Sequence, residues 1–252
     1  MRVKNVCMTP EEEIRRRDEH VLQALKALRM PGMAEYYRRT FVTCAKAPDS
    51  KTTPQGFIEA MVDEQLRQSG ENRKARNLRK AGLWHGSASF DNLDAKKSSL
   101  PPATLAFLRS CSFVADGGFV VITGPAKSGA TYLACAIGSS ACALRLSTKY
   151  YRYTALVQEL ADANREGRLT AKLGEVRSCK CLIIDGWCDQ VMDDRVSVLM
   201  KEIIDFRPGT GGTILVSHAP VSEWQDKAML PKELGSSLFL TTTRSATIVS
   251  LF

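Results

Sequence analysis

The sequence predicts an α/β protein in which helices come first and a parallel sheet with crossover helices follows. Three observations predict this fold. Apolar residues recur at helical spacing near the start of the chain, and from residue 118 onward short β-rich runs alternate with helical segments. In addition, a glycine-bounded loop joins the first of these β-rich runs to an apolar helix.

The N-terminal region is predicted to be helical. Over residues 11–28 the apolar side chains follow helical spacing, with Thr9 as the N-cap and Pro10 in the first turn. Gly82 is expected to end the last helix of this region, because glycine readily adopts the left-handed conformation that follows a helix. Between these ends, further helices are expected over 31–42, 53–69 and 71–82.

A stretch rich in glycine, serine, aspartate and proline, residues 86–102, has no sustained period and is typical of a linker. We therefore predict a boundary near residue 95, between a small helical domain (1–95) and an α/β domain (96–252). In the second domain the predicted strands cover 119–123, 147–151, 180–185 and 212–217, and the predicted helices cover 130–144, 155–167 and 194–206. Such alternation predicts a parallel sheet.

The composition is that of an ordinary globular chain, with 44% hydrophobic and 25% charged residues out of 252. The eight cysteines are too sparse for a disulfide scaffold and several lie in apolar runs, which indicates a reducing compartment. Cys179, Cys181 and Cys188 lack a zinc-type spacing, so no metal site is predicted for them. The first residues form no secretory signal, and the apolar run Tyr132–Leu144 is too short to span a bilayer. We expect a cytoplasmic protein.

The net charge of +8 is concentrated near the N-terminus, where residues 1–100 carry 19 Lys and Arg against 13 Asp and Glu, a net of +6. The densest part is the basic segment Arg73, Lys74, Arg76, Arg79 and Lys80. Helical spacing puts Arg73, Arg76 and Lys80 on one face, which suits a nucleic-acid phosphate backbone. A contact with DNA or a protein partner is the favoured interpretation, and a solvated or internally packed helix is the alternative.

The loop at residues 124–131 reads Gly-Pro-Ala-Lys-Ser-Gly-Ala-Thr. It fits the phosphate-binding pattern G-x-x-x-x-G-K-[ST] except that Ala130 replaces the lysine, while Thr131 could hold Mg²⁺. Backbone N–H groups and a helix N-terminus make such a loop an anion cradle. The expected nucleotide-binding residues are therefore Gly124, Pro125, Ala126, Lys127, Ser128, Gly129, Ala130, Thr131 and Tyr132.

Loss of the lysine should weaken nucleotide binding, because a hydrogen bond to a charged group contributes about 1.5–3 kcal/mol, on the order of 10- to 100-fold in affinity. Phosphoryl transfer should suffer more than binding, since charge moves in the transition state. Lys127 could reach over as a substitute or could be a solvated loop lysine, and the sequence leaves both open.

The strand that ends at Asp185 supplies a second element of the expected site. Four apolar residues followed by aspartate are typical of a Walker B strand, whose carboxylate would hold Mg²⁺ at the carboxyl edge of the sheet. The next position normally carries an acid that orients or deprotonates the attacking water, and here it is Gly186. Asp189, Asp193 and Asp194 are interpreted as loop and helix N-cap acids.

Taken in order, these motifs resemble the IstB-like, DnaC-related AAA+ ATPases, which assist insertion-sequence transposition or load replicative helicases. The resemblance rests on residues 25–37, 71–81, 118–138, 163–169, 181–187 and 211–224. The Leu-x-x-Pro-Gly-Met-Ala segment favours the transposition branch. The resemblance implies a helical N-terminal domain and an AAA+ domain, with ATP or ADP and Mg²⁺ as ligands. It also implies DNA and a transposase-like or helicase-like protein as partners, and self-association.

The resemblance further implies roles for three positions. The family has a Ser-Asn/Gln sensor of the γ-phosphate where this chain has Ser217 and His218, and an imidazole could still donate to a phosphate or to water. The family has an arginine that reaches a neighbouring subunit's nucleotide where this chain has Glu233. With Ala130 and Gly186, four positions central to hydrolysis differ from the family pattern.

The leading hypothesis is a degenerate AAA+ assembly factor that binds DNA and a partner, holds nucleotide weakly, and hydrolyses it slowly or not at all. One alternative is an active ATPase that uses Lys127 in place of the lysine and another acid in place of the one absent at Gly186. In that case Lys127 and His218 are the candidate catalytic residues. The other alternative is a helicase-loader-like module that binds only protein.

Overall fold

The computed structural model describes residues 9–43, 53–93, 100–190, 192–226 and 232–251. The chain forms two compact units, residues 1–73 and 74–252, which divide inside one helix. Residues 74–93 therefore belong to the unit that holds the sheet. The division into domains 1–95 and 96–252 stays a prediction.

The first unit contains α1 (Pro10–Ala27), α2 (Pro31–Tyr37), the π-helical turn η1 (Arg38–Thr43) and the first part of α3 (Pro54–Ala81). Thr9 caps α1 as predicted, since its Oγ1 accepts from Glu12 N at 3.3 Å while Glu12 Oε2 accepts from Thr9 N at 2.9 Å. The two helices predicted over 53–69 and 71–82 are one continuous helix, α3. It ends before Gly82, whose φ of +66° confirms the predicted stop.

The Pro-Gly-Met-Ala segment brings α2 into close contact with α3. Gly32 N and Met33 N donate to Gln65 Oε1 at 2.8 and 3.3 Å, so a side chain of α3 caps the start of α2. A Cβ at Gly32 would lie 2.7 Å from Gln65 Cα. Glycine is therefore required here by the close approach of two helices.

The second unit is built on a five-stranded sheet, in which every pairing is parallel and the order is β2-β3-β4-β1-β5. Its strands are β1 (Phe119–Thr123), β2 (Thr148–Arg152), β3 (Cys181–Asp185), β4 (Gly212–Ser217) and β5 (Thr247–Ser250). The predicted parallel sheet and its four predicted strands are confirmed. The edge strand β5 escaped prediction because it is four residues long and only its Val249 is buried.

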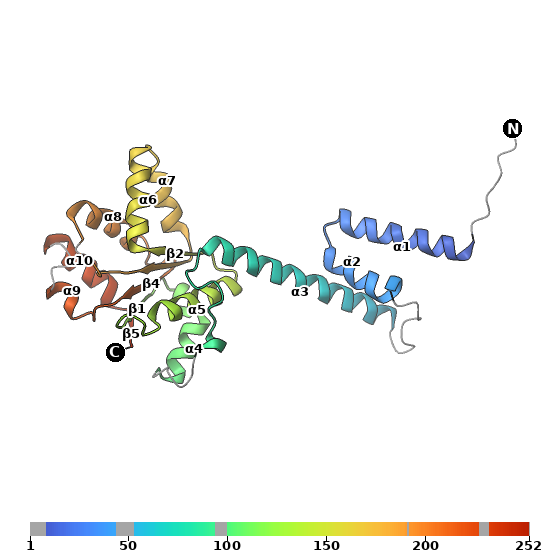
Figure 1. The fold of residues 1–252 in the computed structure, drawn as a ribbon, viewed down its shortest axis with the longest axis horizontal. Coiled ribbons are helices and arrows are strands. Elements are labelled where there is room, and N and C mark those ends of the chain that lie inside the picture. The colour runs from blue at the N-terminus through green and yellow to red at the C-terminus, as the bar shows by residue number, and fades with distance from the viewer. Residues whose placement is uncertain (1–8, 44–52, 94–99, 191, 227–231, 252) are drawn as a thin grey trace. The chain divides into compact units, whose positions relative to one another are not determined.

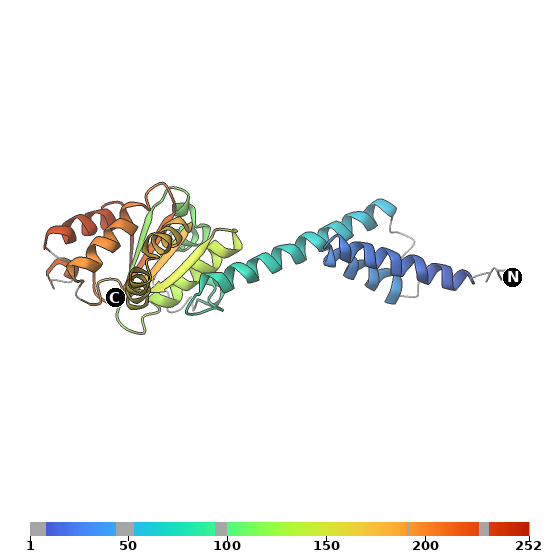
Figure 2. The ribbon, with the colours of Figure 1, turned by 90° about the horizontal axis from the view of Figure 1, so that it is seen from above.

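Helices cover both faces of the sheet (Figures 1 and 2). Val120 and Ile122 face α4 (Pro102–Ser110) and α5 (Ala130–Ala143), whereas Val121 and Leu215 face the opposite layer. That layer holds α6 (Tyr153–Arg165), α7 (Leu169–Ser178), α8 (Asp194–Asp205) and α10 (Lys232–Thr243), and the short α9 (Glu223–Asp226) precedes α10. The predicted helices correspond to α5, α6 and α8, and the strands are buried on both faces, as parallel sheets require.

The described part of the predicted linker packs against the sheet unit. Ala88 is 1% exposed, and Phe90, Leu93 and Leu100 pack against the same core cluster as α5. The described cysteines are buried and free, as expected of small buried hydrophobes: Cys111, Cys135, Cys142, Cys179, Cys181 and Cys188. Cys7 and Cys44 lie outside the described residues. Within the described ranges, each helix is too short or too polar to cross a membrane.

Candidate functional site

A cavity of about 300 Å³ lies at the carboxyl edge of the sheet. It is lined by Thr131, Arg152, Tyr153, Thr154, Asp185, Gly186, Asp189, Gln190 and His218. These residues come from the start of α5 and from the ends of β2, β3 and β4 with the segments that follow them. Ligands of open α/β sheets collect at this edge, so the cavity is the natural binding site of the fold.

The loop after β1 has the backbone of a phosphate cradle. A Cβ at Gly124 would lie 2.5 Å from Ser128 Oγ and 2.9 Å from Leu251 Cβ, so a side chain there would force its neighbours to shift. Lys127 (φ +70°) and Gly129 (φ +93°) both adopt left-handed conformations, and Gly129 is the N-cap of α5. Turns of this kind direct successive N–H groups to one side, where they bind anions. Ser128 Oγ is buried without a hydrogen-bond partner among the described residues.

The cradle lacks its lysine, and Lys127 does not replace it at the cavity. Ala130 is 7% exposed and packs in the core cluster of α5. Lys127 is exposed and is absent from the described lining. Of the described lining residues, only Arg152 is a lysine or arginine, and its guanidinium carbon lies 3.8 Å from the centre of the Trp84 ring. The permanent positive charge at the cavity therefore comes from the end of β2.

Of the nine expected nucleotide-binding residues, Thr131 alone lines the cavity in the described structure. Tyr132 instead packs beside the segment 83–93, with its ring centre 5.7 Å from that of His85. Its Oη accepts a hydrogen bond from Ser89 N at 3.4 Å. The loop residues from Gly124 to Ala130 are not among the described lining residues.

Asp185 and Thr131, both with oxygen-bearing side chains, line the same cavity. Asp185 is 8% exposed, and its Oδ2 accepts a hydrogen bond from Tyr150 Oη at 2.6 Å. A carboxylate and a hydroxyl are suitable Mg²⁺ ligands, so these residues fit the ion expected beside a bound nucleotide. Trp187, which follows two residues later, is fully buried.

Asp189 connects the loop after β3 to the end of β4. Its Oδ1 accepts from His218 N at 2.8 Å and from Ser217 Oγ at 3.3 Å, and its Oδ2 pairs with His218 Nδ1. Gly186 N and Trp187 N also donate to Val216 O. Asp189, interpreted from the sequence as a loop acid, lies in a loop but also lines the cavity, which that interpretation missed.

The other predicted positions are not among the lining residues that the structure describes. Asp193 is the N-cap of α8, as predicted, and accepts from Val196 N at 2.8 Å. Glu233 lies in α10, and its side chain is outside the described residues. All five residues of the basic segment are exposed on α3, and Asn77 between them donates to Cys142 O of α5 at 3.4 Å.

Sequence reasoning missed several lining residues, namely Arg152, Tyr153, Thr154 and Gln190. A signal for three of them was present. Arg152, Tyr153 and Thr154 follow the predicted strand 147–151 at its carboxyl end, where ligands are expected. Gln190 has no such signal, because its place depends on how the loop after β3 folds.

The fold and the site together define a class. A parallel sheet in the order β2-β3-β4-β1-β5, with a phosphate-type loop after β1 and a buried carboxylate ending β3, is that of the AAA+ P-loop proteins. The chain belongs to the IstB-like ATP binding protein family, whose sequence profile matches residues 23–249.

Comparison with individual proteins supports this family assignment. A protein of insertion sequence IS1162 from Pseudomonas fluorescens, named for ATP binding, is 29% identical over 205 residues, which cover 81% of this chain and 87% of that protein. The insertion-sequence protein y4uH from Sinorhizobium fredii, also named for ATP binding, is 28% identical over 83% of this chain and 84% of its own length. The crystal structure of the DnaC helicase loader matches with a TM-score of 0.50 at 20% identity, covering 59% of this chain and 88% of that one.

Proposed function

We propose that this protein is a nucleotide-binding assembly factor of an insertion sequence, which uses the loop 124–131 and the adjoining cavity to bind ATP or ADP. The observation that carries the proposal is the presence of Thr131 and Asp185 in one cavity beside a loop shaped as an anion cradle. The relatives named for insertion sequences and ATP binding support it.

Nucleotide binding is weak in this proposal, and hydrolysis is slow or lost. Backbone N–H groups of the loop would hold the phosphates, and Thr131 and Asp185 would hold Mg²⁺, which offsets phosphate charge when bound. Ala130 contributes no cation, so the terminal phosphates lose one charged partner. Gly186 contributes no acid beside Asp185, so the attacking water lacks the group usually found there.

The proposed partners are DNA and a transposase-like protein, in a cytoplasmic, self-associating complex. The exposed basic segment of α3 is the proposed DNA contact, because its cations lie on an exposed helix where they can meet phosphates without reading bases. The alternative of a helicase-loader-like module is supported by the likeness of fold to DnaC alone. The alternative of an ATPase that relies on Lys127 is less well supported, because Lys127 is exposed and absent from the described cavity lining.

The experiment is a titration of the purified protein with fluorescent ADP and ATP analogues, with Mg²⁺ and with EDTA. We expect saturable binding that Mg²⁺ strengthens and that Asp185→Asn weakens. A protein that binds neither nucleotide at millimolar concentration, while remaining folded by circular dichroism, would contradict the proposal.

A further inference from the structure

Gly186 and Asp189 occupy complementary positions in the loop after β3. Gly186 has a φ of +89°, and a Cβ built on it would lie 3.5 Å from Asp189 Oδ2. The carboxylate of Asp189 thus reaches the space that a side chain at position 186 would enter. An acid is therefore present near the usual place, although it comes from three residues further along the chain.

Asp189 is held firmly, because the end of β4 binds both of its oxygens. Oδ1 accepts from His218 N at 2.8 Å and from Ser217 Oγ at 3.3 Å, and Oδ2 contacts His218 Nδ1. The Asp189 side chain is 20% exposed and that of His218 is 54% exposed, so the pair is anchored at its acid end and open at its imidazole end.

The contact with Asp189 selects one form of the imidazole. A carboxylate on Nδ1 favours a proton on that nitrogen, which leaves Nε2 with a lone pair. Both residues line the cavity together with Thr131 and Asp185. A neutral imidazole with a lone pair on Nε2 can accept a proton from water.

We propose that His218 is the general base for hydrolysis of a nucleoside triphosphate at this site and that Asp189 is its positioning residue. This inference rests on the proposed function, because it requires the nucleotide to bind at the loop 124–131. In this proposal the His218–Asp189 pair activates the attacking water, a task that an acid at position 186 would otherwise perform.

Hydrolysis at this pair is a single displacement on phosphorus. Water oxygen bonds to the γ-phosphorus while the bond from that phosphorus to the oxygen bridging the β-phosphate breaks. The proton of the water passes to His218 Nε2, and the Asp189 carboxylate stabilises the resulting imidazolium. ADP and inorganic phosphate leave, and the half-exposed imidazolium returns its proton to solvent.

A first experiment observes the pair without nucleotide. Imidazole ¹⁵N shifts are assigned readily, because the chain has 3 histidines. We expect the neutral form of His218 to carry its proton on Nδ1. In Asp189→Asn the amide can donate to Nδ1, so the proton should move to Nε2. A proton already on Nε2 in the unmodified protein overturns the proposal.

A second experiment measures single-turnover release of γ-³²P phosphate from Mg·ATP. We expect His218→Gln and Asp189→Asn to lower the rate by on the order of 100-fold or more while nucleotide affinity stays within a few-fold. The matched control is Asp193→Asn, which removes the same charge four residues away but keeps a good helix N-cap. Circular dichroism checks that each variant is folded.

The pH dependence of the hydrolysis rate distinguishes a catalytic role of His218 from a purely structural one. With the base intact, the rate should fall toward acid pH, since a protonated imidazole cannot accept a proton. In His218→Gln this decrease of the rate at acid pH should be absent. The other titratable lining residues, Asp185, Asp189, Arg152 and Tyr153, remain in both proteins. Binding without turnover, or turnover unaffected by His218→Gln, overturns this inference and leaves the proposed function standing. Absence of nucleotide binding overturns both.

Discussion

Tyr150 Oη donates a hydrogen bond to Asp185 Oδ2 at 2.6 Å, joining β2 to the carboxylate that ends β3. Both side chains are 8% exposed. Burial, followed by the hydrogen bond to Asp185, raises the pKa of Tyr150, so the phenol is a protonated donor at neutral pH. One oxygen of the expected Mg²⁺ ligand is therefore held by the protein itself, which fixes the direction of the other.

Tyr150→Phe should weaken Mg²⁺-dependent nucleotide binding. Without the phenol, Asp185 is free to rotate, and the loss of one hydrogen bond to a charged group costs about 1.5 kcal/mol, on the order of 10-fold in affinity. The measurement is a nucleotide titration at several Mg²⁺ concentrations. Tyr151→Phe is the matched control, because the next residue faces the opposite core cluster. Equal Mg²⁺ dependence in the two variants would argue against this role of Tyr150.

Ala130→Lys should strengthen nucleotide binding by on the order of 10- to 100-fold, because it returns a cation to the phosphates. Titration with Mg·ADP and Mg·ATP measures the gain, which should be larger for the triphosphate. Ala130 is 7% exposed at the start of α5, so a thermal melt must accompany the titration to show that the longer side chain is accommodated. A folded variant with unchanged affinity would contradict a phosphate site at this loop.

Lys127→Ala should leave nucleotide affinity and turnover within about 2-fold, since the side chain is exposed and absent from the described cavity lining. The same titration and turnover assays measure it. Because Lys127 has a φ of +70°, Lys127→Gly is a useful companion that preserves the left-handed turn. Loss of turnover in both variants would favour the alternative in which Lys127 substitutes for the missing lysine.

The sequence predicts the scaffold of the site better than its chemistry. The phosphate-type loop and Asp185 could be predicted because each belongs to a local pattern. A buried strand followed by a glycine loop or by an acid can be recognised within about ten residues of sequence. Tyr150 and Asp185 are 35 residues apart, and Asp189 and His218 are 29 apart. Those pairs meet only because β2, β3 and β4 are adjacent in the sheet. Periodicity gives the face of a strand but not the order of strands, so such contacts could not be predicted.

Changing Arg73, Arg76 and Lys80 together to glutamine should weaken duplex DNA binding and reduce its salt dependence. For each phosphate that the variant no longer neutralises, the slope of log affinity against log salt concentration should fall by about 1, largely irrespective of DNA sequence. Glutamine keeps the helix propensity of α3. Three other exposed arginines, Arg165, Arg168 and Arg195, changed in the same way, provide a control of equal charge. If both triple variants weaken binding equally, the basic segment is not a specific DNA-binding surface.

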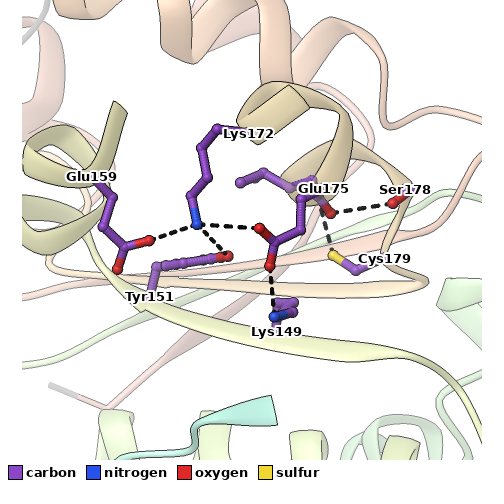
Figure 3. Close-up of polar contacts among 8 residues, drawn as sticks. Lys149, Tyr151, Glu159, Lys172, Glu175, Ser178 and Cys179 are labelled. Atoms are coloured by element: carbon purple, nitrogen blue, oxygen red, sulfur yellow. Dashed lines mark hydrogen bonds and ion pairs between the residues drawn. The ribbon is translucent and has the colours of Figure 1, made fainter. Parts of the chain in front are cut away.

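A lysine–glutamate network clamps the edge strand β2 to the helices beside it (Figure 3). Lys149 Nζ on β2 donates to Glu175 Oε1 on α7 at 2.8 Å. Lys172 Nζ lies between Glu159 Oε2 at 2.6 Å and Glu175 Oε2 at 3.5 Å, and it also donates to Tyr151 Oη at 3.5 Å. The hydrogen bond from Lys149 is the main cause of the lowered pKa of Glu175.

Glu175→Gln should therefore destabilise the protein near neutral pH and not in acid. A carboxyl group whose pKa is lower in the folded than in the unfolded state adds stability above its unfolded pKa, about 4.3, and that stability is lost as the pH falls through the folded pKa. The side chain is 46% exposed, so solvent screening limits the contribution to less than about 1 kcal/mol. Urea unfolding at pH 7 and near pH 3 measures it. Glu166→Gln is the control, because its partner Arg168 lies only two residues away in the turn between α6 and α7, and the pair does not involve β2. A difference between Glu175→Gln and the unmodified protein that persists undiminished at the acid pH would show that packing, rather than the ion pairs, holds β2 to α7.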